Sequence, residues 1–192
     1  MSHKFTTLLV TGLMAISLTG CGNQTPVPYT PPAQNQPAPA PTPAATTTQT
    51  TVYAIKLNDN GASANSVQVG CGDSAIPVVI TALAPYDPTN QVASINAALM
   101  ALENTTATQF NGQGLENPIT KSVVTVQSVD QVGTNYVVHM NGQFSFSGTC
   151  DVPRQRAQYE ETIKKAMLTG NTFAMDYNGG GQTAWDDAFS SK

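Results

Sequence analysis

Alternating or continuous apolar positions in the second part of the chain predict five β-strands. These segments are rich in β-branched and aromatic residues and are bounded by stretches containing Gly, Asn or Pro, which favour turns. They are residues 52–57, 75–83, 123–129, 136–140 and 172–177. Pro77 predicts that the early part of the second strand lies on a sheet edge, where a missing amide proton is tolerated. Gly133 predicts a hairpin turn between the third and fourth strands.

Alternate side chains of a strand share one face. In the fourth strand we therefore expect Tyr136, Val138 and Met140 to lie together, with His139 on the opposite face. The last strand is expected to turn one face to the protein interior through Phe173, Met175 and Tyr177.

Apolar residues that repeat every three or four positions predict two longer helices and a short one. The first helix opens at Asp87, Pro88 and Thr89, and its apolar stripe is formed by Val92, Ile95, Leu99 and Leu102. The second begins at Asp151, which can cap it, has Pro153 in its first turn and closes at Gly170. The short helix contains Trp185, Ala188 and Phe189 and is expected to cover an apolar edge.

The second helix is predicted to be amphipathic. Its inward stripe is formed by Ala157, Ile163 and Met167. Its exposed side carries two Glu–Lys pairs at i,i+4 spacing, Glu160 with Lys164 and Glu161 with Lys165. The order of elements predicts an α+β fold, a single compact domain with one mixed or antiparallel sheet and two main helices packed on it. Residues 105–118 are polar and are expected to form a long loop.

Composition and charge restrict the classes of partner. The chain has 192 residues, which suits one domain with extensions. Only 10% of the residues are charged, and the formal net charge is −4. Because this charge repels phosphate backbones, nucleic acid is not expected as a partner.

Residues 1–20 have the features of a lipoprotein signal peptide. Lys4 provides a positive start, and an apolar run over residues 8–18 follows that is too short to span a membrane as a helix. The run ends in Leu-Thr-Gly-Cys, which resembles a bacterial lipobox and implies cleavage before Cys21 and lipid on its sulfur. The alternative is an ordinary secretory leader in which a cysteine follows a small residue by chance.

Residues 21–51 are predicted to be the lipidated cysteine and a disordered linker. The linker consists mostly of Pro, Thr, Gln and Ala and carries no charge, so it cannot bury enough apolar surface to fold. Residues 52–192 then form the α+β domain. We expect this domain to be extracytoplasmic and held on a bacterial membrane by the lipid, with the choice of inner or outer membrane left open.

The remaining cysteines are expected to form a disulfide. If Cys21 carries lipid, Cys71 and Cys150 are left in an oxidising compartment, where pairing is the default. The bond would join the start of the second strand to the start of the second helix. A metal site is the alternative, but neither cysteine has a second ligand at short spacing, and His139 is alone after the leader. We therefore expect neither a metal nor another cofactor.

Two short motifs carry a family resemblance. Residues 71–78 read Cys-Gly-Asp-Ser-Ala-Ile-Pro-Val, and residues 148–154 read Gly-Thr-Cys-Asp-Val-Pro-Arg. With the helix around residues 97–102 and the strand that ends at Asn178-Gly179, they resemble the cysteine-containing branch of the GerMN domain family, named after a spore-germination protein. The resemblance covers about residues 52–189. Its most specific positions, beside the two cysteines, are Gly72, Asp73, Ser74, Asp151, Pro153 and Arg154.

The resemblance implies a compact α+β domain of the cell envelope. Members of the family occur in lipoproteins, have no established catalytic activity, and are considered to mediate assembly or partner contacts. The domain is also similar in outline to ring-building domains of sporulation machinery. This chain departs from the common pattern in its Asn- and Gly-containing loop and in its three consecutive glycines at residues 179–181.

Other motifs give little support for catalysis. Residues 70–75 fit a G-x-G-x-x-A dinucleotide pattern, but Pro77 and β-branched residues follow where a helix is required. The neighbouring carboxylates at residues 160–161 and 186–187 point apart on a helix, and His139 has no nucleophile near it in sequence. A triad assembled from distant residues is left open. We expect Arg154 and Arg156 to pair with Asp151 or Asp73 and hold the disulfide-linked segments together.

Two functional hypotheses are ranked above an enzymatic function. The first is a non-catalytic interaction or assembly module of the cell envelope, whose partner is an envelope protein or a second copy of the chain. The second is a lipoprotein that binds a small molecule or a cell-wall glycan. Its possible binding residues are Phe110, Tyr177 and Trp185, because aromatic and amide groups suit sugar rings.

Overall fold

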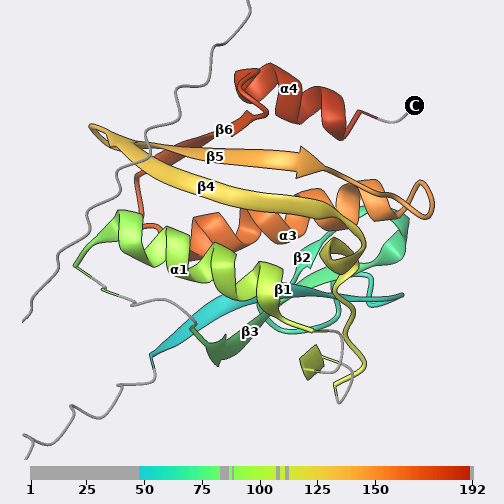
Figure 1. Cartoon of the computed structure of the whole chain (residues 1–192). Coiled ribbons are helices and arrows are strands. Elements are labelled where there is room, and N and C mark those ends of the chain that lie inside the picture. Colours follow the sequence, from blue (N-terminus) through green and yellow to red (C-terminus); the bar gives the residue numbers. More distant parts are fainter. Residues whose placement is uncertain (1–47, 83–86, 88, 107–108, 111–112, 191–192) are drawn as a thin grey trace, which may run out of the picture. The chain divides into compact units, whose positions relative to one another are not determined.

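The computed structural model describes residues 48–82, 87, 89–106, 109–110 and 113–190 (Figure 1). The predicted signal peptide, Cys21 and most of the predicted linker lie outside these residues. Among the helices that are described, none is both long and apolar enough to cross a membrane. The first strand begins at Gln49, so the folded part starts earlier than the predicted boundary at residue 52. Thr50 and Thr51 already pair with the neighbouring strand, which explains the difference.

The first sheet has the order β1-β3-β2 and is antiparallel throughout. It contains β1 (Gln49–Lys56), β2 (Val67–Gln68) and β3 (Ser74–Thr81). β2 was not predicted, because a strand of two residues is too short to show alternation. It pairs only with Ser74 and Ala75, so among the described strands Pro77 has a neighbour on one side only. The edge position predicted for Pro77 is confirmed.

The second sheet has the order β4-β5-β6. β4 (Val123–Val132) and β5 (Asn135–Gln143) form the predicted hairpin, with Gly133 in the turn at a φ of 66° that favours glycine. β6 (Thr172–Tyr177) runs parallel to β5, and α3 makes the crossover between them. As predicted, Tyr136, Val138 and Met140 are buried on one face of β5, and His139 lies on the other.

Three of the described helices match the predicted ones, though not at every boundary, and residues 109–110 of the predicted loop are helical as well. The three are α1 (Gln91–Asn104), α3 (Asp151–Ala166) and α4 (Gly181–Ala188), with short 3₁₀ helices η1 (Gly70–Gly72) and η2 (Pro118–Lys121). α1 begins after Asn90, whose side chain accepts the Ala93 amide, and not at the predicted residues 87–89. Asp151 is the first residue of α3 and not its cap. Its carboxylate instead binds side chains and an amide outside the helix.

The Glu–Lys pairs predicted along α3 are wrong. Glu160 binds Arg156 at 2.7 Å, one turn toward the N-terminus. Glu161 binds Lys164 at 2.6 Å, at i,i+3 spacing. Arg156 also reaches Asp186 of α4, so its planar guanidinium joins two helices where a lysine ammonium would provide one point charge.

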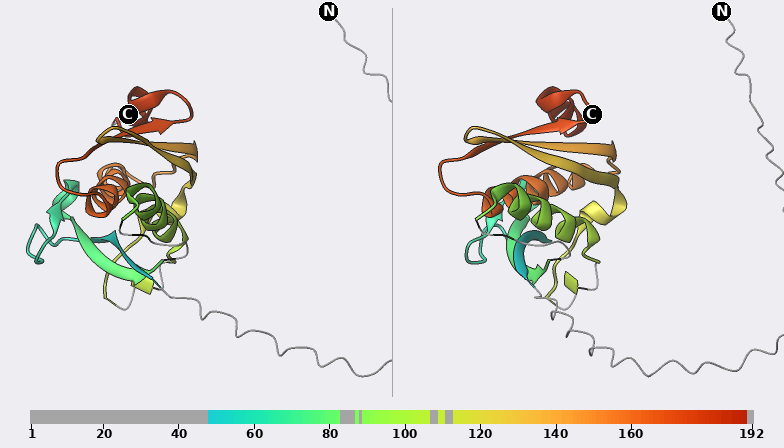
Figure 2. Two further views of the ribbon diagram at one scale, coloured as in Figure 1. Left: turned by 90° about the vertical axis from the view of Figure 1, so that its left-hand side faces the viewer. Right: turned by 60° about the vertical axis from the view of Figure 1, so that its left-hand side comes forward.

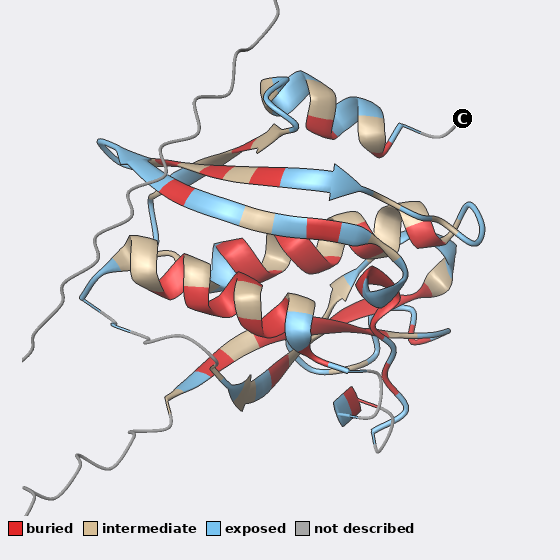
Figure 3. Cartoon of the chain, viewed as in Figure 1, coloured by how far each residue is buried: buried red, intermediate tan, exposed pale blue. Residues whose placement is uncertain are grey.

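The predicted α+β class is confirmed, but the strands form two sheets and not one. The two longer helices lie between the sheets, with β4, β5 and β6 on one side and β1 and β3 on the other (Figures 1 and 2). The buried residues of α1 and α3 and of both sheets therefore face a shared interior (Figure 3). α4 packs against β6, which is the edge strand of the second sheet. The prediction that the terminal helix covers an apolar edge is therefore confirmed.

The inner side of α3 carries polar residues beside the predicted Ile163, which the apolar pattern did not predict. Gln155, Gln158 and Thr162 are fully buried. Thr162 accepts the Tyr53 amide at 3.0 Å, and Gln158 donates to the Tyr53 carbonyl at 3.0 Å. Tyr53 lies on β1, an edge strand, so these bonds satisfy backbone groups that no neighbouring strand pairs.

Glu103 of α1 is a half-buried carboxylate between the helices and the second sheet. It accepts the Val126 amide at 3.4 Å and the Tyr159 hydroxyl at 3.4 Å. Burial is the largest influence and raises the pKa of Glu103 from 4.5 to about 7, because these two hydrogen bonds offset it only in part. The same burial, together with the Glu103 charge, raises the pKa of Tyr159.

Replacing Glu103 by Gln should remove a pH dependence of stability. Between pH 4.5 and about 7 the folded protein binds more protons at Glu103 than the unfolded chain, so the free energy of unfolding falls as pH rises. Allowing for partial exposure, this loss should be on the order of 2 kcal/mol. Urea denaturation at several pH values should therefore show a shallower decline for Glu103→Gln, while Glu116→Gln, at an exposed site, should match the wild type. Equal declines in all three proteins would contradict the prediction.

Candidate functional site

A disulfide joins two segments that lie far apart in the sequence. Cys71 of η1 and Cys150, which precedes α3, are bonded with their Cα atoms 5.8 Å apart. The predicted pairing is confirmed. Cys71 and Gly72 both have positive φ values, of 66° and 74°, so the chain turns sharply here before β3. We call the disulfide and its surrounding ion pairs the disulfide junction.

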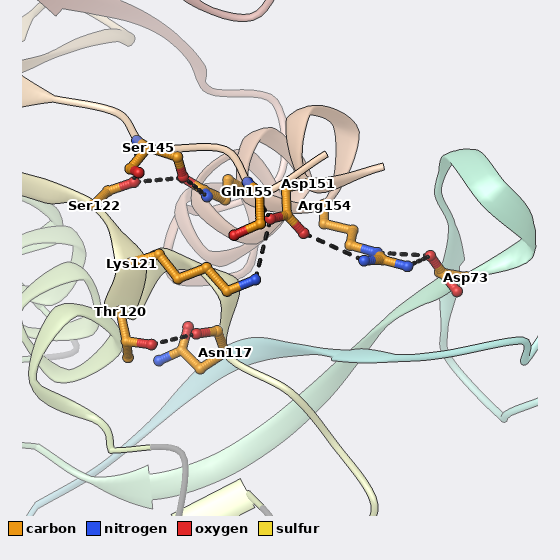
Figure 4. Close-up of polar contacts among 10 residues, drawn as sticks. Asp73, Asn117, Thr120, Lys121, Ser122, Ser145, Asp151, Arg154 and Gln155 are labelled. Atoms are coloured by element: carbon orange, nitrogen blue, oxygen red, sulfur yellow. Dashed lines mark hydrogen bonds and ion pairs between the residues drawn. The ribbon is translucent and has the colours of Figure 1, made fainter. Parts of the chain in front are cut away.

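Arg154 joins both sides of the disulfide junction. Its Nε and Nη2 lie 2.7 and 2.6 Å from Oδ2 of Asp73, and its Nη1 lies 3.3 Å from Oδ1 of Asp151 (Figure 4). The Asp73 side chain is 2% exposed, and its other oxygen accepts the Asn58 amide. A carboxylate so deeply buried is stable only when it is paired. The predicted contact of Arg154 is therefore confirmed with both aspartates, whereas Arg156 pairs with Glu160 and Asp186.

Asp151 links the disulfide junction to η2 and to the loop before α3. It accepts Lys121 Nζ at 3.1 Å and the Ser147 amide at 2.9 Å (Figure 4). Burial acts to raise the pKa of Asp151, but the hydrogen bonds from Ser147, Lys121 and Arg154 outweigh it, so the pKa lies below its ordinary value. Asp151 is thus an ionised anchor for the loop.

The other motif residues pack close to the disulfide. Ser74 is buried and accepts the Gly61 amide at 2.8 Å. A side chain at Gly72 would meet Asn60 Oδ1 at 2.9 Å, and Gly70 lies against the ring of Pro153. Positions singled out by the GerMN resemblance are therefore brought together, in contacts that hold the two cysteine segments in place.

The loop before α3 is fixed at a second point. Ser122 donates to Gln155 Oε1 at 2.8 Å, and Gln155 donates to the Ser145 carbonyl at 2.8 Å. The Ser145 amide donates in turn to Ser122 at 2.9 Å, which closes a ring of hydrogen bonds (Figure 4). The main chain on both sides of Phe146 is thus held, at Ser145 by this ring and at Ser147 by Asp151.

Aromatic rings gather beside this loop. Phe144 lies between 4.5 and 6.1 Å, centroid to centroid, from each of five other rings. These are Phe146, Tyr159, Tyr177, Trp185 and Phe189. Trp185 is fully buried, and its indole N–H donates to Glu160 at 3.2 Å. The cluster joins the loop, α3, β6 and α4 into one apolar unit.

A groove of about 500 Å³ opens at the edge of this cluster. The aromatic groove, as we name it, is lined by Gln143, Phe144, Phe146, Gly148, Thr149, Val152, Tyr177, Asp187, Ala188 and Ser190. Its volume is within the range of small-molecule sites, about 300–1,000 Å³. One wall is the loop that precedes Cys150, so the disulfide junction borders the groove.

Tyr177 is fixed at the groove by the end of β5. Its hydroxyl donates to the Gly142 carbonyl at 2.7 Å, and the Asn178 amide donates to the same oxygen at 3.1 Å. The Gly142 amide donates back to Asn178 Oδ1 at 2.9 Å. A Cβ at Gly142 would lie 2.0 Å from the Val123 carbonyl, so only glycine allows this arrangement.

Of the three predicted binding residues, only Tyr177 lines the aromatic groove. Phe110 and Trp185 are fully buried, because each fills space in the core. Phe144 and Phe146, which line the groove, were not predicted to bind. The signal was present in the Phe-Ser-Phe sequence just after the hairpin, since residues at i and i+2 of an extended segment share a face.

Most of the candidate catalytic groups are engaged in contacts, whereas Asp187 lines the aromatic groove. His139 Nδ1 lies 2.7 Å from Asp176, and its Nε2 lies 3.1 Å from Asp130. Both ring nitrogens thus face carboxylates across the three strands of the second sheet. Glu160, Glu161 and Asp186 bind basic side chains. Among the described residues, no three His, Cys, Asp or Glu side chains are arranged to hold a metal ion.

Comparison of the chain with models of protein families, with curated proteins and with solved structures finds no match. The GerMN resemblance therefore stays a prediction from the two cysteine motifs. What the site does must be inferred from its own geometry and from the sequence.

Substitution of Arg154 by Ala should lower the free energy of unfolding by about 3 kcal/mol, because Asp73 would remain buried without its cation. Arg156→Ala removes the same kind of cation two residues further along α3, but one that is 37% exposed. Its cost should stay below about 1 kcal/mol. Urea denaturation of both variants with the disulfide intact measures the difference. Similar losses in the two variants would contradict the role assigned to the Asp73–Arg154 pair.

Proposed function

We propose that the chain is an extracytoplasmic lipoprotein of a bacterial cell envelope, held on the membrane by lipid at Cys21. The leader and the Leu-Thr-Gly-Cys sequence support export and lipidation. The Cys71–Cys150 disulfide supports an oxidising compartment, since such bonds persist outside the cytoplasm. The uncharged Pro- and Thr-rich segment would then act as a tether between the lipid and the domain.

The proposed role of the domain is that of a non-catalytic interaction or assembly module. The observation that carries this proposal is the aromatic groove, whose loop wall is held by the disulfide, Asp151 and the Ser122–Gln155 ring of hydrogen bonds. A preformed surface binds with little loss of conformational freedom. Its partner would be an envelope protein or a second copy of the chain, as the GerMN resemblance also implies.

A small-molecule or cell-wall-glycan-binding lipoprotein is the second candidate. The lining of the aromatic groove favours it, because ring faces from Phe144, Phe146 and Tyr177 lie beside amide and hydroxyl groups from Gln143 and Thr149. Small-molecule sites combine apolar walls with a few polar groups in this way.

Lipid attachment can be tested at the cysteine itself. Mass spectrometry of the mature protein should find an N-terminal Cys21 carrying acyl chains, and the protein should remain in the membrane fraction. Cys21→Ala should prevent acylation, while Gly22→Ala, at the adjacent position, should keep it. An unmodified Cys21 in the wild type would refute the proposed anchor.

Partner contact can be tested by photocrosslinking on intact cells. A photoreactive residue in place of Gln143 or Ser190, on the groove rim, should give one discrete adduct, identified by mass spectrometry as an envelope protein or a second copy. The same residue at Val132, which is 67% exposed in the hairpin, should not give that adduct. Identical adducts at all three positions, or none at the rim, would contradict the proposed interaction surface.

A further inference from the structure

Three aromatic side chains, Phe144, Phe146 and Tyr177, are among the residues that line the aromatic groove. The rings of Phe144 and Phe146 are inclined by 11°, with centroids 6.1 Å apart. Tyr177 lies 5.1 Å from Phe144 and is tilted by 37°. All three side chains are partly exposed and line the groove. Such a surface suits a ligand with flat, apolar C–H faces.

The rim of the aromatic groove is polar and carries no positive charge. Gln143, Thr149 and Ser190 are exposed and provide one amide and two hydroxyl groups. Asp187 contributes a carboxylate, and the lining residues include neither lysine nor arginine. Anions are therefore disfavoured, whereas hydroxyl groups of a neutral ligand find both donors and acceptors.

We propose that the aromatic groove binds an uncharged saccharide chain. A sugar ring has an apolar C–H face and a polar edge, so the faces would lie on Phe144, Phe146 and Tyr177 while the hydroxyl groups bind the rim. A purely apolar ligand would make no use of the polar rim, and an acidic ligand would meet Asp187 without a compensating cation among the lining residues. This inference rests on the second candidate function, a glycan-binding lipoprotein, and names the ligand class of the aromatic groove.

The main chain beside Phe146 and the hydroxyl of Tyr177 are fixed by hydrogen bonds, and Phe144 is fixed by packing against the other rings of the cluster. Main-chain amides on either side of Phe146 donate to Ser122 and Asp151. The hydroxyl of Tyr177 donates to the Gly142 carbonyl. Little conformational freedom would therefore be lost when a sugar chain binds, which favours affinity from a small contact area.

The test uses the full chain in detergent and isothermal titration with four oligosaccharides of similar length. Two are neutral, an N-acetylglucosamine tetramer and cellotetraose; one is anionic, a galacturonic acid tetramer; and one is cationic, a glucosamine tetramer. At least one neutral oligosaccharide should bind at least tenfold more tightly than both charged ones. No measurable binding of either neutral oligosaccharide, or tighter binding of a charged one, would overturn the proposal.

Phe146→Ala provides the site-specific test. It removes one exposed ring from the floor, and binding of the neutral oligosaccharide should weaken by about tenfold. Phe173→Ala makes the same chemical change at a partly buried β6 residue outside the lining and should leave binding unchanged. Circular dichroism must show that both variants are folded. Equal binding by Phe146→Ala and the wild type would overturn the assignment of the site.

The outcomes separate this inference from the proposed function. Absence of oligosaccharide binding, together with a specific protein adduct at the groove rim on cells, would overturn the saccharide and leave the interaction module in place. If the chain binds oligosaccharide but its Cys21 is found without lipid, the proposed ligand class would be supported and the proposed membrane anchor would be refuted.

Discussion

The position of α3 depends on the need to satisfy backbone groups of an edge strand inside the protein. β1 has β3 on one side, and on its other side the amide and carbonyl of Tyr53 meet Thr162 and Gln158. An unpaired buried amide or carbonyl costs about 1–3 kcal/mol. α3 therefore has to lie in one register along β1, and this register sets the positions of Cys150, at its start, and of Tyr159, within the aromatic cluster.

The same helix explains which parts of the fold could be predicted. The pattern of apolar residues located the longer strands of both sheets, and Gly133 located the hairpin turn. Both signals arise within a few neighbouring residues. The interior of α3 could not be predicted in this way, since Gln155, Gln158 and Thr162 resemble surface residues until their partners on other elements are known. The division into two sheets was also hidden, because alternation shows that a strand has an inner face but not which strand lies beside it.

The candidate site was predictable where chemistry restricts the partners. With Cys21 assigned to lipid, the two remaining cysteines have one way to pair, and Asp73 and Arg154 were among the few charged residues near them in sequence. The aromatic residues had no such restriction. Trp185 is fully buried among rings of the aromatic cluster, and its indole N–H is satisfied by Glu160, a contact that joins residues on two different helices. An aromatic residue alone does not tell whether its ring lines a groove or fills a core.

The loop between β5 and α3 connects the disulfide junction with the aromatic groove. Cys150 fixes one end of this loop through the disulfide. The middle of the loop is held by hydrogen bonds from the Ser145 and Ser147 amides to the side chains of Ser122 and Asp151. These two kinds of constraint are independent, because hydrogen bonds form wherever the chain folds and the disulfide forms only where thiols are oxidised. Reduction would leave Phe146 held from both sides but would remove the covalent link between η1 and Cys150, the residue that follows the wall at residues 148–149. The disulfide therefore contributes more to the shape of the groove wall than to the position of the rings on its floor.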